Sequence, residues 1–455
     1  MHGPMPSGTV LAHGCFDLIH LGHVRHLQEA KSLGSRLVVS VTSDRFVRKG
    51  VGRPHFTAEQ RMEMLRALGC VDDVLLNDAP DASVMIRAIR PDIYVKGIDY
   101  DGPPDDGLRL ETEAVEAHGG RLHITHTDKW SSSRLLNNEQ YPEETLRYLD
   151  RAKSGGFRDA IFAALDRADR LKLAFVGETI IDEYRYVRAL GKASKEFMLA
   201  TVQTGREEFE GGILAAAKHM EWKGATVITA GTPIRKTRFV DADFTRKIFE
   251  VYSTKGIDVE PHEMERFNRL ILAAAENCEG VIAMDFGHGL IGLPQRTALY
   301  QAEFLAVNAQ TNAGNFGYNP VTNYLCADMI CVDDPEARLA TRMQRDPIDE
   351  VVLALARKTD AANVIVTHGR NGCVSYANGG GECIAIPAFV TQGVDTMGAG
   401  DAFLATAAPL VCAGLGLEAA AFAGNVAGAI KVSIVGHRRH VTRDELMQSV
   451  DTLLK

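Results

Sequence analysis

A pair of histidines near the N-terminus could stabilise charge that develops on a phosphate group. His20 and His23 flank Gly22 in the segment GCFDLIHLGH, residues 14–23, which lies between an apolar run and a helical pattern. The first N–H groups of a helix attract phosphate, glycine lets the backbone approach closely, and imidazoles donate hydrogen bonds to phosphoryl oxygens. Taken alone, the two histidines are equally well explained as polar residues of a first helical turn.

A second segment, near the C-terminus, combines a candidate anion hole with an acid. Gly398, Ala399 and Gly400 precede Asp401 in DTMGAGDAF, residues 395–403. A Gly-Ala-Gly turn that opens a helix exposes consecutive N–H groups to an anion, and the acid that follows can take a proton from an attacking hydroxyl. A bare Gly-x-Gly-Asp is also an ordinary helix start, so the interpretation depends on its neighbours.

Alternating strands and helices must position both segments. In the first part of the chain, apolar strand runs at 9–12, 37–41, 73–76 and 93–95 alternate with helical patterns over 21–33, 58–68 and 83–89. A second series has strands near 173–176, 281–284, 329–332 and 364–367. This α/β alternation predicts parallel sheets that bind ligands at their carboxyl edges.

The length of 455 residues predicts two or three domains at roughly 100–200 residues per domain. A charged, helical stretch around 140–170 is interrupted by Ser154, Gly155 and Gly156. We therefore expect an N-terminal domain over 1–139, a helical linker over 140–170 and a C-terminal domain over 171–455.

Charge and composition exclude several classes of protein. Fifty Lys and Arg against 59 Asp and Glu give a net charge of −9, so no general basic surface awaits nucleic acid. The eight cysteines contain no C-x-x-C pair, which argues against a zinc site or a disulfide framework. The N-terminus lacks a targeting pattern, and no apolar stretch approaches the roughly 18 residues of a membrane span. We expect a cytoplasmic protein with no nucleic-acid or membrane partner.

Residues 8–138 resemble the nucleotidyltransferase superfamily of cytidylyltransferases and adenylyltransferases. Four segments carry the resemblance in order: GCFDLIHLGHVRHLQEAKSLGSRLVVSVTSD, RKGVGRPHFTAEQRMEMLRAL, PDIYVKGIDY and WSSSRLL. The similarity is strongest to the adenylyltransferase domains of ADP-heptose synthesis enzymes. It implies a Rossmann-like domain with a parallel sheet.

This resemblance implies that His20 and His23 stabilise the transition state of nucleotidyl transfer and that Lys49 reaches the phosphates. The other residues that it places at the nucleotide are Gly14, Phe16, Asp17, Gly22, Lys96, Asp99, Ser131, Ser132 and Ser133. ATP or CTP would be the substrate, with Mg²⁺ on the triphosphate, and pyrophosphate would leave in an in-line attack. Without the resemblance, Lys49 is a solvated loop charge and the serine run an ordinary N-cap.

Residues 171–455 resemble the ribokinase-like (PfkB) sugar kinases. The matching segments are FVGETIIDEY, GKASKEFMLAT, EGGILAAAKHMEWKGA, KTRF, AMDFGHG, VTHGRNGC, DTMGAGDAF and NVAGAIKV. The resemblance implies an α/β/α domain in which Asp401 deprotonates a sugar hydroxyl and the 398–400 turn is the anion hole. It assigns Asp182, Gly211, Gly212, Lys236, Arg238 and Asp285 to the substrate, and Gly369 and Asn425 to the ATP base. Asp182 and Asp285 could also be capping acids after strands.

The kinase-like half departs from its relatives in several places. Ala215 stands where relatives carry a substrate-contacting asparagine, which puts the choice of substrate in doubt. Relatives organise Mg²⁺ with an Asn-x-x-Glu motif. In this chain Asp333 replaces the asparagine, and Glu336 keeps the acid. The chain between 226 and 236 is short, so we expect a reduced lid. An amide-rich stretch, 308–319, could bind a polyol or be a solvated loop.

Together, the two resemblances favour a bifunctional enzyme of nucleotide-activated sugar biosynthesis. It would phosphorylate a heptose-like sugar phosphate and transfer a nucleotidyl group to a sugar 1-phosphate, with its domains in the reverse order of the bifunctional heptose enzymes. One alternative is a cytidylyl- or adenylyltransferase for a polyol phosphate, with a degenerate kinase-like domain. Another is a nucleotide-binding regulatory or scaffold protein. The partners would be small sugar phosphates and nucleoside triphosphates, and a homodimer stays open.

Overall fold

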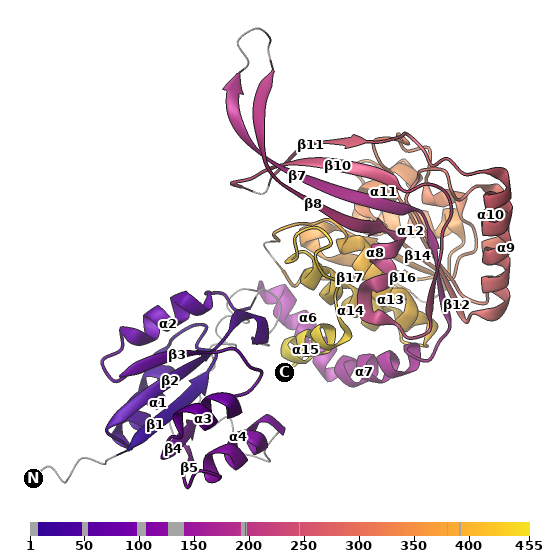
Figure 1. Cartoon of the computed structure of the whole chain (residues 1–455). Helices are drawn as coiled ribbons and strands as arrows, with labels where there is room; N and C mark the ends of the chain where they lie inside the picture. The colour runs from indigo at the N-terminus through magenta and orange to yellow at the C-terminus, as the bar shows by residue number, and fades with distance from the viewer. Residues whose placement is uncertain are drawn as a thin grey trace, which may run out of the picture. The chain divides into compact units, whose positions relative to one another are not determined.

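The chain folds into two compact α/β units, Met1–Pro142 and Glu143–Lys455 (Figure 1). The computed structural model describes residues 8–47, 53–97, 106–125, 141–192, 196, 198–244, 246–379, 381–390 and 393–455. The α/β fold class expected from the sequence is confirmed in both units.

The N-terminal unit is a parallel five-stranded sheet in the order β3-β2-β1-β4-β5. Its strands are β1 (Thr9–Gly14), β2 (Arg36–Thr42), β3 (Asp73–Asn77), β4 (Ile93–Lys96) and β5 (Arg121–Ile124). Its helices are α1 (Leu21–Ser32), α2 (Ala58–Arg66), α3 (Ser83–Ile89), α4 (Asp106–Glu116) and the short 3₁₀ helix η1 (Asp44–Phe46). The strand order reverses between β1 and β4, and ligands of open α/β sheets bind at that point.

Alternate residues of β1 face two different helical layers. Val10 packs in one core cluster with Leu27 of α1 and Leu65 of α2. Leu11 packs in the other cluster with Ile86 of α3 and with residues of α4. Because successive strand residues point to opposite faces, both faces of this sheet are buried and β1 is apolar from Val10 to Ala12.

The C-terminal unit contains an eight-stranded sheet in the order β17-β16-β15-β14-β13-β12-β6-β9. Its strands are β6 (Leu173–Gly177), β9 (Ala225–Ile228), β12 (Gly280–Asp285), β13 (Leu305–Ala309), β14 (Met329–Asp333), β15 (Asn363–Thr367), β16 (Cys373–Ala377) and β17 (Ile384–Ile386). Neighbouring strands pair in parallel from β9 through β6, β12, β13 and β14 to β15. Strands β16 and β17 pair antiparallel with their neighbours. The carboxyl ends of the parallel strands therefore meet at one edge.

Helices flank this sheet. They are α6 (Glu143–Ser154), α7 (Phe157–Ala168), α8 (Ile213–Lys218), α9 (Pro261–Asn277), α10 (Leu293–Leu299), α11 (Asp334–Thr341), α12 (Ile348–Thr359), α13 (Ala399–Cys412), α14 (Leu417–Lys431) and α15 (Arg443–Leu453). The described part of the unit also contains three 3₁₀ helices, η3 (His219–Glu221), η4 (Val321–Asn323) and η5 (Gly369–Asn371).

The segment expected to be a linker forms α6 and α7, which pack on α14 and α15. Arg151 of α6 pairs with Glu418 of α14 at 2.6 Å, and Arg158 of α7 pairs with Asp451 of α15 at 2.7 Å. These two helices belong to the compact C-terminal unit. The division into 1–139, 140–170 and 171–455 stays a prediction.

A second, four-stranded sheet lies beside the large one, in the order β11-β10-β7-β8. Its strands are β7 (Thr179–Lys192), β8 (Leu199–Gly212), β10 (Ile234–Asp241) and β11 (Lys247–Tyr252), and the β7–β8 hairpin projects away from the unit (Figure 1). β9 ends at Ile228 and β10 begins at Ile234, so the chain passes almost directly from the edge of the large sheet into the small one. The short connection noted in the sequence lies at this edge.

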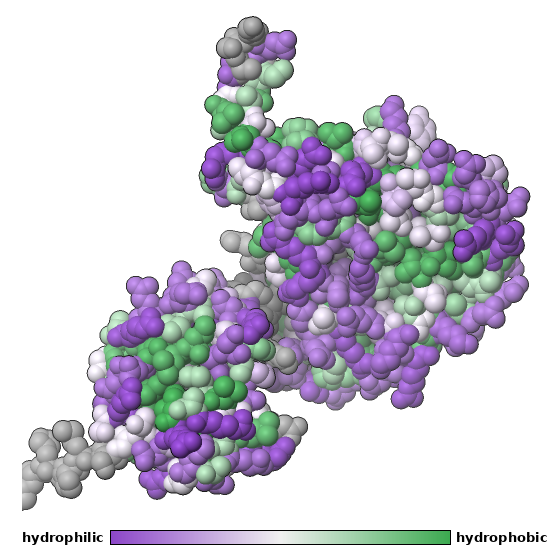
Figure 2. All heavy atoms as spheres, in the orientation of Figure 1, coloured by the Kyte–Doolittle hydropathy of each residue, from purple (hydrophilic) through white to green (hydrophobic). Residues whose placement is uncertain are grey.

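Apolar side chains are exposed on the projecting hairpin. Leu190 of β7 and Leu199 of β8 are exposed, and green, hydrophobic residues appear along the hairpin in Figure 2.

Among the described residues, no helix has the length and apolar character that crossing a membrane requires.

Candidate active sites

The turn between β1 and α1 holds the two predicted histidines side by side. His20 is the N-cap of α1, and its Nδ1 accepts a hydrogen bond from the Gly22 N–H at 3.1 Å. The rings of His20 and His23 stack with centroids 3.9 Å apart, and Phe16 packs edge-on against His23 at 5.4 Å. Both imidazoles therefore lie at a helix N-terminus, where free N–H groups attract phosphate.

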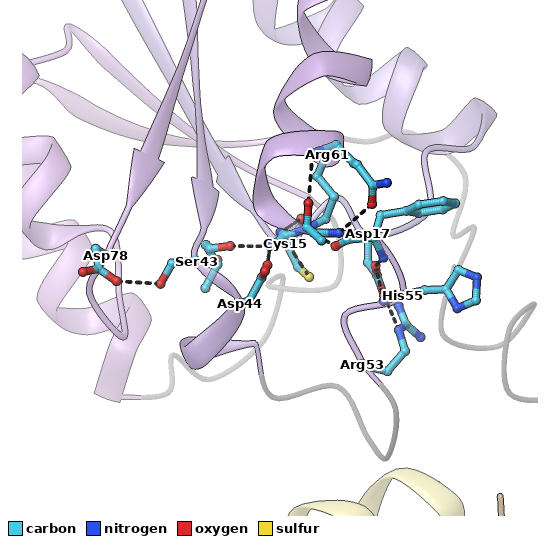
Figure 3. A network of polar contacts seen from close by, with 12 residues as sticks. Cys15, Asp17, Ser43, Asp44, Arg53, His55, Arg61 and Asp78 are labelled. Carbon is cyan, nitrogen blue, oxygen red and sulfur yellow. Dashed lines mark hydrogen bonds and ion pairs between the residues drawn. The ribbon is translucent and has the colours of Figure 1, made fainter. Parts of the chain in front are cut away.

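Asp17 anchors the segment that leads into α2. Its buried carboxylate accepts hydrogen bonds from the backbone N–H groups of His55 at 2.6 Å and Phe56 at 3.0 Å (Figure 3). It also pairs with the guanidinium of Arg53. These contacts give Asp17 a positioning role, and its predicted contact with the nucleotide stays a prediction.

Arg61 is a positioning residue that was not predicted from the sequence. Its fully buried guanidinium donates to the carbonyl oxygens of Cys15 at 2.5 Å and Thr42 at 2.8 Å, and it pairs with Asp44 (Figure 3). Arg61 thereby ties α2 to the ends of β1 and β2. The sequence does contain a signal of its burial, because Arg61 lies four residues before Leu65 and therefore on the apolar face of its helix.

Lys96 ends β4, next to β1 at the point where the strand order reverses. Its ammonium pairs with Glu111 of α4 at 2.9 Å, and both side chains are buried. Gly14 ends β1, and Gly22 is buried in the first turn of α1. The remaining residues predicted for this site are Lys49, Asp99, Ser131, Ser132 and Ser133, which lie outside the described residues.

A cavity of about 1050 Å³ opens in the C-terminal unit at the carboxyl ends of the parallel strands. Asn308 of β13, Asp333 of β14 and Thr367 of β15 line it. The predicted site residues on its wall are Asp182, Gly212, Lys236, Arg238, Asp333, Glu336, Gly369, Gly398, Ala399, Gly400, Asp401 and Asn425. Residues far apart in the sequence thus share one pocket of the size that small-molecule ligands occupy.

Asp401 lies in the first turn of α13, directly after the 398–400 turn. Gly398 is the N-cap of α13, and its φ of 74° is one that side-chain-bearing residues rarely adopt. Nε2 of Gln310 donates to Oδ1 of Asp401 at 3.3 Å. Burial raises the pKa of Asp401, while the charges of His437 and Lys431 oppose that rise. A carboxylate beside a glycine-rich turn at a helix N-terminus is placed to accept a proton from a hydroxyl.

A cluster of charged side chains forms another part of the cavity wall. Asp182 of β7 pairs with Arg238 of β10, and Nε2 of His437 lies 3.2 Å from its carboxylate. Burial by itself would raise the pKa of Asp182, but His437 and Arg238 outweigh it and lower the pKa to about 2. Lys236, in register with Asp182, is also buried, which lowers its pKa. His437 was not predicted from the sequence.

Two of the predicted substrate residues are set back from the cavity. Gly211 does not line it but makes room for Asp182, because a Cβ on Gly211 would lie 2.5 Å from Oδ2 of that carboxylate. Asp285 is buried at the end of β12 and accepts a hydrogen bond from the Tyr324 hydroxyl at 2.8 Å. Neither residue belongs to the described residues that form the wall.

Asp333 and Glu336 form the capping box of α11 as well as lining the cavity. Oδ1 of Asp333 accepts from the Glu336 N–H at 2.8 Å, and Oε2 of Glu336 accepts from the Asp333 N–H at 3.0 Å. Burial, and then the charge of Asp333, raises the pKa of Glu336 to about 8.

The neighbouring carboxyl oxygens of Asp333 and Glu336 suit Mg²⁺, which takes oxygen ligands. No cluster of three or more His, Cys, Asp or Glu side chains able to hold a metal occurs among the described residues. This pair fits an ion held mainly by substrate oxygens and water.

Gly369 and Asn425 line the cavity near its loops. Gly369 begins η5 after β15 with φ of 54°, and Nδ2 of Asn425 donates to the Pro387 carbonyl at 2.6 Å. Asn425 thereby ties α14 to the chain that follows β17. The predicted contact of these two residues with the ATP base stays a prediction.

The amide-rich loop after β13 is held by its own side chains. Nδ2 of Asn315 donates to the Gln310 carbonyl at 3.0 Å, and Oδ1 of Asn312 accepts from the N–H groups of Gly314 and Asn315 at 2.8 and 3.1 Å. These asparagine amides shape the loop, whereas Asn308 and Gln310 line the cavity.

Glu178, between β6 and β7, is a buried carboxyl for which the sequence predicted no role. It accepts hydrogen bonds from the N–H groups of Phe286 at 2.8 Å and His288 at 3.1 Å, and Phe286 lines the cavity. Burial, and then the charge of Asp285, raises the pKa of Glu178 to about 7. Glu178 therefore holds the backbone of Phe286, a residue of the cavity wall, without lining the cavity itself.

The raised pKa of Glu178 predicts a pH-dependent stability. The folded state keeps this proton up to about pH 7, whereas an unfolded glutamate loses it near about pH 4.3. Glu178 therefore lowers the free energy of unfolding as pH rises through this interval, with no further change above it. Because Glu178→Gln cannot ionise, its Tm relative to wild type should rise between about pH 4.5 and 7.5. Thermal unfolding in matched buffers measures this, and a constant difference contradicts the raised pKa.

Gly398→Ala is expected to disable the C-terminal site. A Cβ there would lie 2.8 Å from Cε1 of His437 and 3.3 Å from Cε of Lys431, so the turn must shift. Because misplaced N–H groups would bind a phosphate poorly, we expect the kinase reaction predicted from the sequence, followed as ADP formation, to fall about 100-fold.

Gly414→Ala is the matched control for this substitution. Gly414 has φ of 81°, and a Cβ on it would meet no described atom within 4 Å. Both variants thus carry similar backbone strain, but only Gly398→Ala disturbs the cavity. Equal activity in the two variants would show that the position of the turn is unimportant.

Two family models match the chain, one at each site. Residues 11–138 match the model described as cytidylyltransferase-like, and residues 319–442 match the pfkB family carbohydrate kinase model. The first range contains the turn with His20 and His23, and the second contains Asp401. The chain thus matches a cytidylyltransferase-like model in its N-terminal part and a pfkB family carbohydrate kinase model in its C-terminal part.

Curated relatives match the N-terminal part. The Bifunctional protein HldE of Citrifermentans bemidjiense is 43% identical over 131 residues, which cover 28% of this chain and 26% of the relative. The Bifunctional protein HldE of Streptomyces coelicolor is 50% identical over 134 residues, covering 28% of each chain. The match therefore spans about a quarter of the length of these relatives.

Solved structures align with a larger share of the chain at low identity. Phosphofructokinase-2 from Escherichia coli aligns with 63% of this chain and 100% of its own, at 13% identity and a TM-score of 0.49. Ribokinase from Thermotoga maritima aligns with 62% of this chain and 99% of its own, at 18% identity and a TM-score of 0.46.

Proposed function

We propose that this chain is a bifunctional enzyme of nucleotide-activated sugar biosynthesis. One site phosphorylates a heptose-like sugar phosphate with ATP, and the other transfers a nucleotidyl group from ATP or CTP to a sugar 1-phosphate. The arrangement around Asp401 carries the proposal furthest. An acid, an anion-binding turn and a cluster of charged side chains share one cavity of about 1050 Å³.

In the proposed kinase step, a sugar hydroxyl lies between Asp401 and the γ-phosphate of ATP. Asp401 accepts the hydroxyl proton while the oxygen attacks phosphorus in line, and ADP leaves. The N–H groups of the 398–400 turn neutralise charge on the transferred phosphoryl group. Lys236 and Arg238 supply cations for the phosphate that the sugar already carries.

In the proposed nucleotidyl step, the phosphate of a sugar 1-phosphate attacks the α-phosphorus of ATP or CTP, and pyrophosphate leaves. His20 and His23 stabilise the charge that develops at the N-terminus of α1. We also assign Lys96, which lies at the adjacent strand end and is paired with Glu111, and Lys49 to the nucleotide. No covalent intermediate with the protein is needed, because positioning and charge neutralisation suffice.

In both steps, a bound Mg²⁺ would neutralise charge on the triphosphate. In the C-terminal cavity, Asp333 and Glu336 are the side chains that would hold it. Phosphate oxygens and water would supply its other ligands, as is usual for Mg²⁺.

The second candidate is a monofunctional nucleotidyltransferase with a degenerate or ligand-sensing kinase-like domain. Ala215 motivates it, because this residue is buried in α8 and takes the place of an expected substrate ligand. The direct passage from β9 to β10 points the same way. Against it, the cavity keeps Asp401, the anion-binding turn and the charged cluster around Asp182. The bifunctional assignment is therefore favoured.

The proposal also covers partners and compartment. Small sugar phosphates and nucleoside triphosphates are the proposed ligands, and in a homodimer a second copy would cover Leu190 and Leu199 on the projecting hairpin. All eight cysteines lie among the described residues and none forms a disulfide, which agrees with a reducing cytoplasm.

The test of the kinase half is ADP formation by the purified chain with ATP, Mg²⁺ and a panel of sugar phosphates. We expect a heptose 7-phosphate to give the highest turnover. Turnover with another sugar phosphate would correct the substrate and keep the reaction. No ADP above background with any member, while pyrophosphate release persists, would favour the monofunctional candidate.

A further inference from the structure

Lys431 is a fully buried cation beside the anion-binding turn. It is the last residue of α14, with no exposed surface, and its Nζ donates to the carbonyl oxygens of Met397 at 2.7 Å and Gly436 at 2.8 Å. Met397 directly precedes Gly398, and Cε of Lys431 lies 3.3 Å from where a Cβ on Gly398 would stand. The ammonium group therefore joins the turn to the loop that follows α14.

The carboxylate of Asp395 binds the same two residues from the other side. It accepts hydrogen bonds from the N–H groups of Gly436 at 2.9 Å and Met397 at 3.1 Å, and its salt bridge goes to Lys247 at 2.7 Å. The N–H groups of Met397 and Gly436 thus bind an acid while their carbonyl oxygens bind Lys431. The ion pairs within the described part of the chain do not include Lys431.

Carbonyl oxygens are the ligands by which proteins hold monovalent cations. An ammonium group carries the same single positive charge as such a cation. A buried charge is costly unless fixed dipoles satisfy it, so this lysine is retained at a cost in stability. That cost is explained if its positive charge acts on an anion at the neighbouring turn.

We propose that Lys431 is a built-in monovalent cation of the anion hole. Its ammonium occupies a carbonyl-lined site that K⁺ or NH₄⁺ would otherwise fill, and it holds the 398–400 turn in its anion-binding shape. Lys431 is thus a positioning residue that makes nucleotide binding independent of K⁺. The cation site stands on the contacts above, whereas its benefit to phosphoryl transfer rests on the proposed kinase function.

The test compares wild type and Lys431→Met in choline, potassium and ammonium chloride at equal concentration. The readouts are Tm and calorimetric affinity for a non-hydrolysable ATP analogue. In choline chloride we expect the variant to bind the analogue about tenfold more weakly than wild type. K⁺ or NH₄⁺ should restore at least part of that affinity and of the Tm. Wild type should behave alike in all three salts.

Lys358→Met is the matched control, because Nζ of Lys358 also donates to two carbonyl oxygens, those of Ala340 at 3.2 Å and Thr341 at 3.1 Å. Lys358 is exposed and outside the cavity wall, so its variant should match wild type in every salt. The proposal is overturned if folded Lys431→Met shows the same Tm and affinity in all three salts.

Wild type alone decides the matter if Lys431→Met does not fold. A tighter nucleotide affinity of wild type in K⁺ than in choline would overturn the proposal, since the site would not be filled by the lysine; equal affinities support it. None of these readouts requires a sugar substrate. A failure to form ADP would therefore refute the kinase step without touching the cation site.

Discussion

Asp401→Asn is expected to lower sugar-phosphate-dependent ADP formation by about 10²–10⁴-fold, the range that a general base contributes. Asparagine keeps the shape of the side chain but cannot accept the hydroxyl proton. The carboxylate is buried in the first turn of α13 and contacts Gln310, so the substitution leaves the cavity and its turn in place. Pyrophosphate release at the N-terminal site should be unchanged, because Asp401 has no part in that step.

Asp444→Asn is the control for this change, since Asp444 also lies in the first turn of a helix, α15, but is exposed. It should retain full ADP formation. The measurement is a coupled ADP assay at saturating ATP with each variant. If Asp401→Asn keeps activity close to that of Asp444→Asn, Asp401 is not the base.

His23→Asn is expected to lower pyrophosphate release by about 10²–10³-fold, the loss typical of removing one donor to a developing charge. The stacked imidazoles of His20 and His23 lie at the N-terminus of α1, where a triphosphate would bind. His20→Asn should cause a loss of similar size. Because asparagine is a good N-cap, it preserves the capping role of His20 and removes only the imidazole.

His118→Asn is the control for the histidine variants. His118 is exposed just after α4, in the same unit, and should leave the reaction unaffected. The assay is pyrophosphate release with ATP or CTP and a sugar 1-phosphate. Full activity of both His20→Asn and His23→Asn would remove the histidine turn from the chemistry.

Much of the fold follows from patterns of neighbouring residues. The apolar run at 173–176 becomes β6, Leu173–Gly177, and the helical pattern at 83–89 becomes α3, Ser83–Ile89. These elements are predictable because hydrophobic periodicity reports the local conformation and the buried face. Helix ends shift by a residue or two, as at α2, which ends at Arg66 instead of 68.

The candidate sites were only partly predictable, because side-chain roles depend on contacts between distant segments. Short motifs mark the 398–401 turn, which does line the cavity. No local pattern shows that Asp17 binds the N–H groups of residues 55 and 56, or that Asp285 is set behind the wall. Glu178 and Lys431 were missed for the same reason. Their partners lie elsewhere in the chain, and a buried charge resembles any other charge in a sequence.

The central claim is that one chain carries two independent active sites, and a double dissociation tests it most directly. ADP formation and pyrophosphate release would be measured on the same preparations of wild type, Asp401→Asn and His23→Asn. We predict that wild type performs both reactions, that Asp401→Asn loses only ADP formation, and that His23→Asn loses only pyrophosphate release. The absence of either reaction in wild type, or the loss of both in one folded variant, would contradict the account.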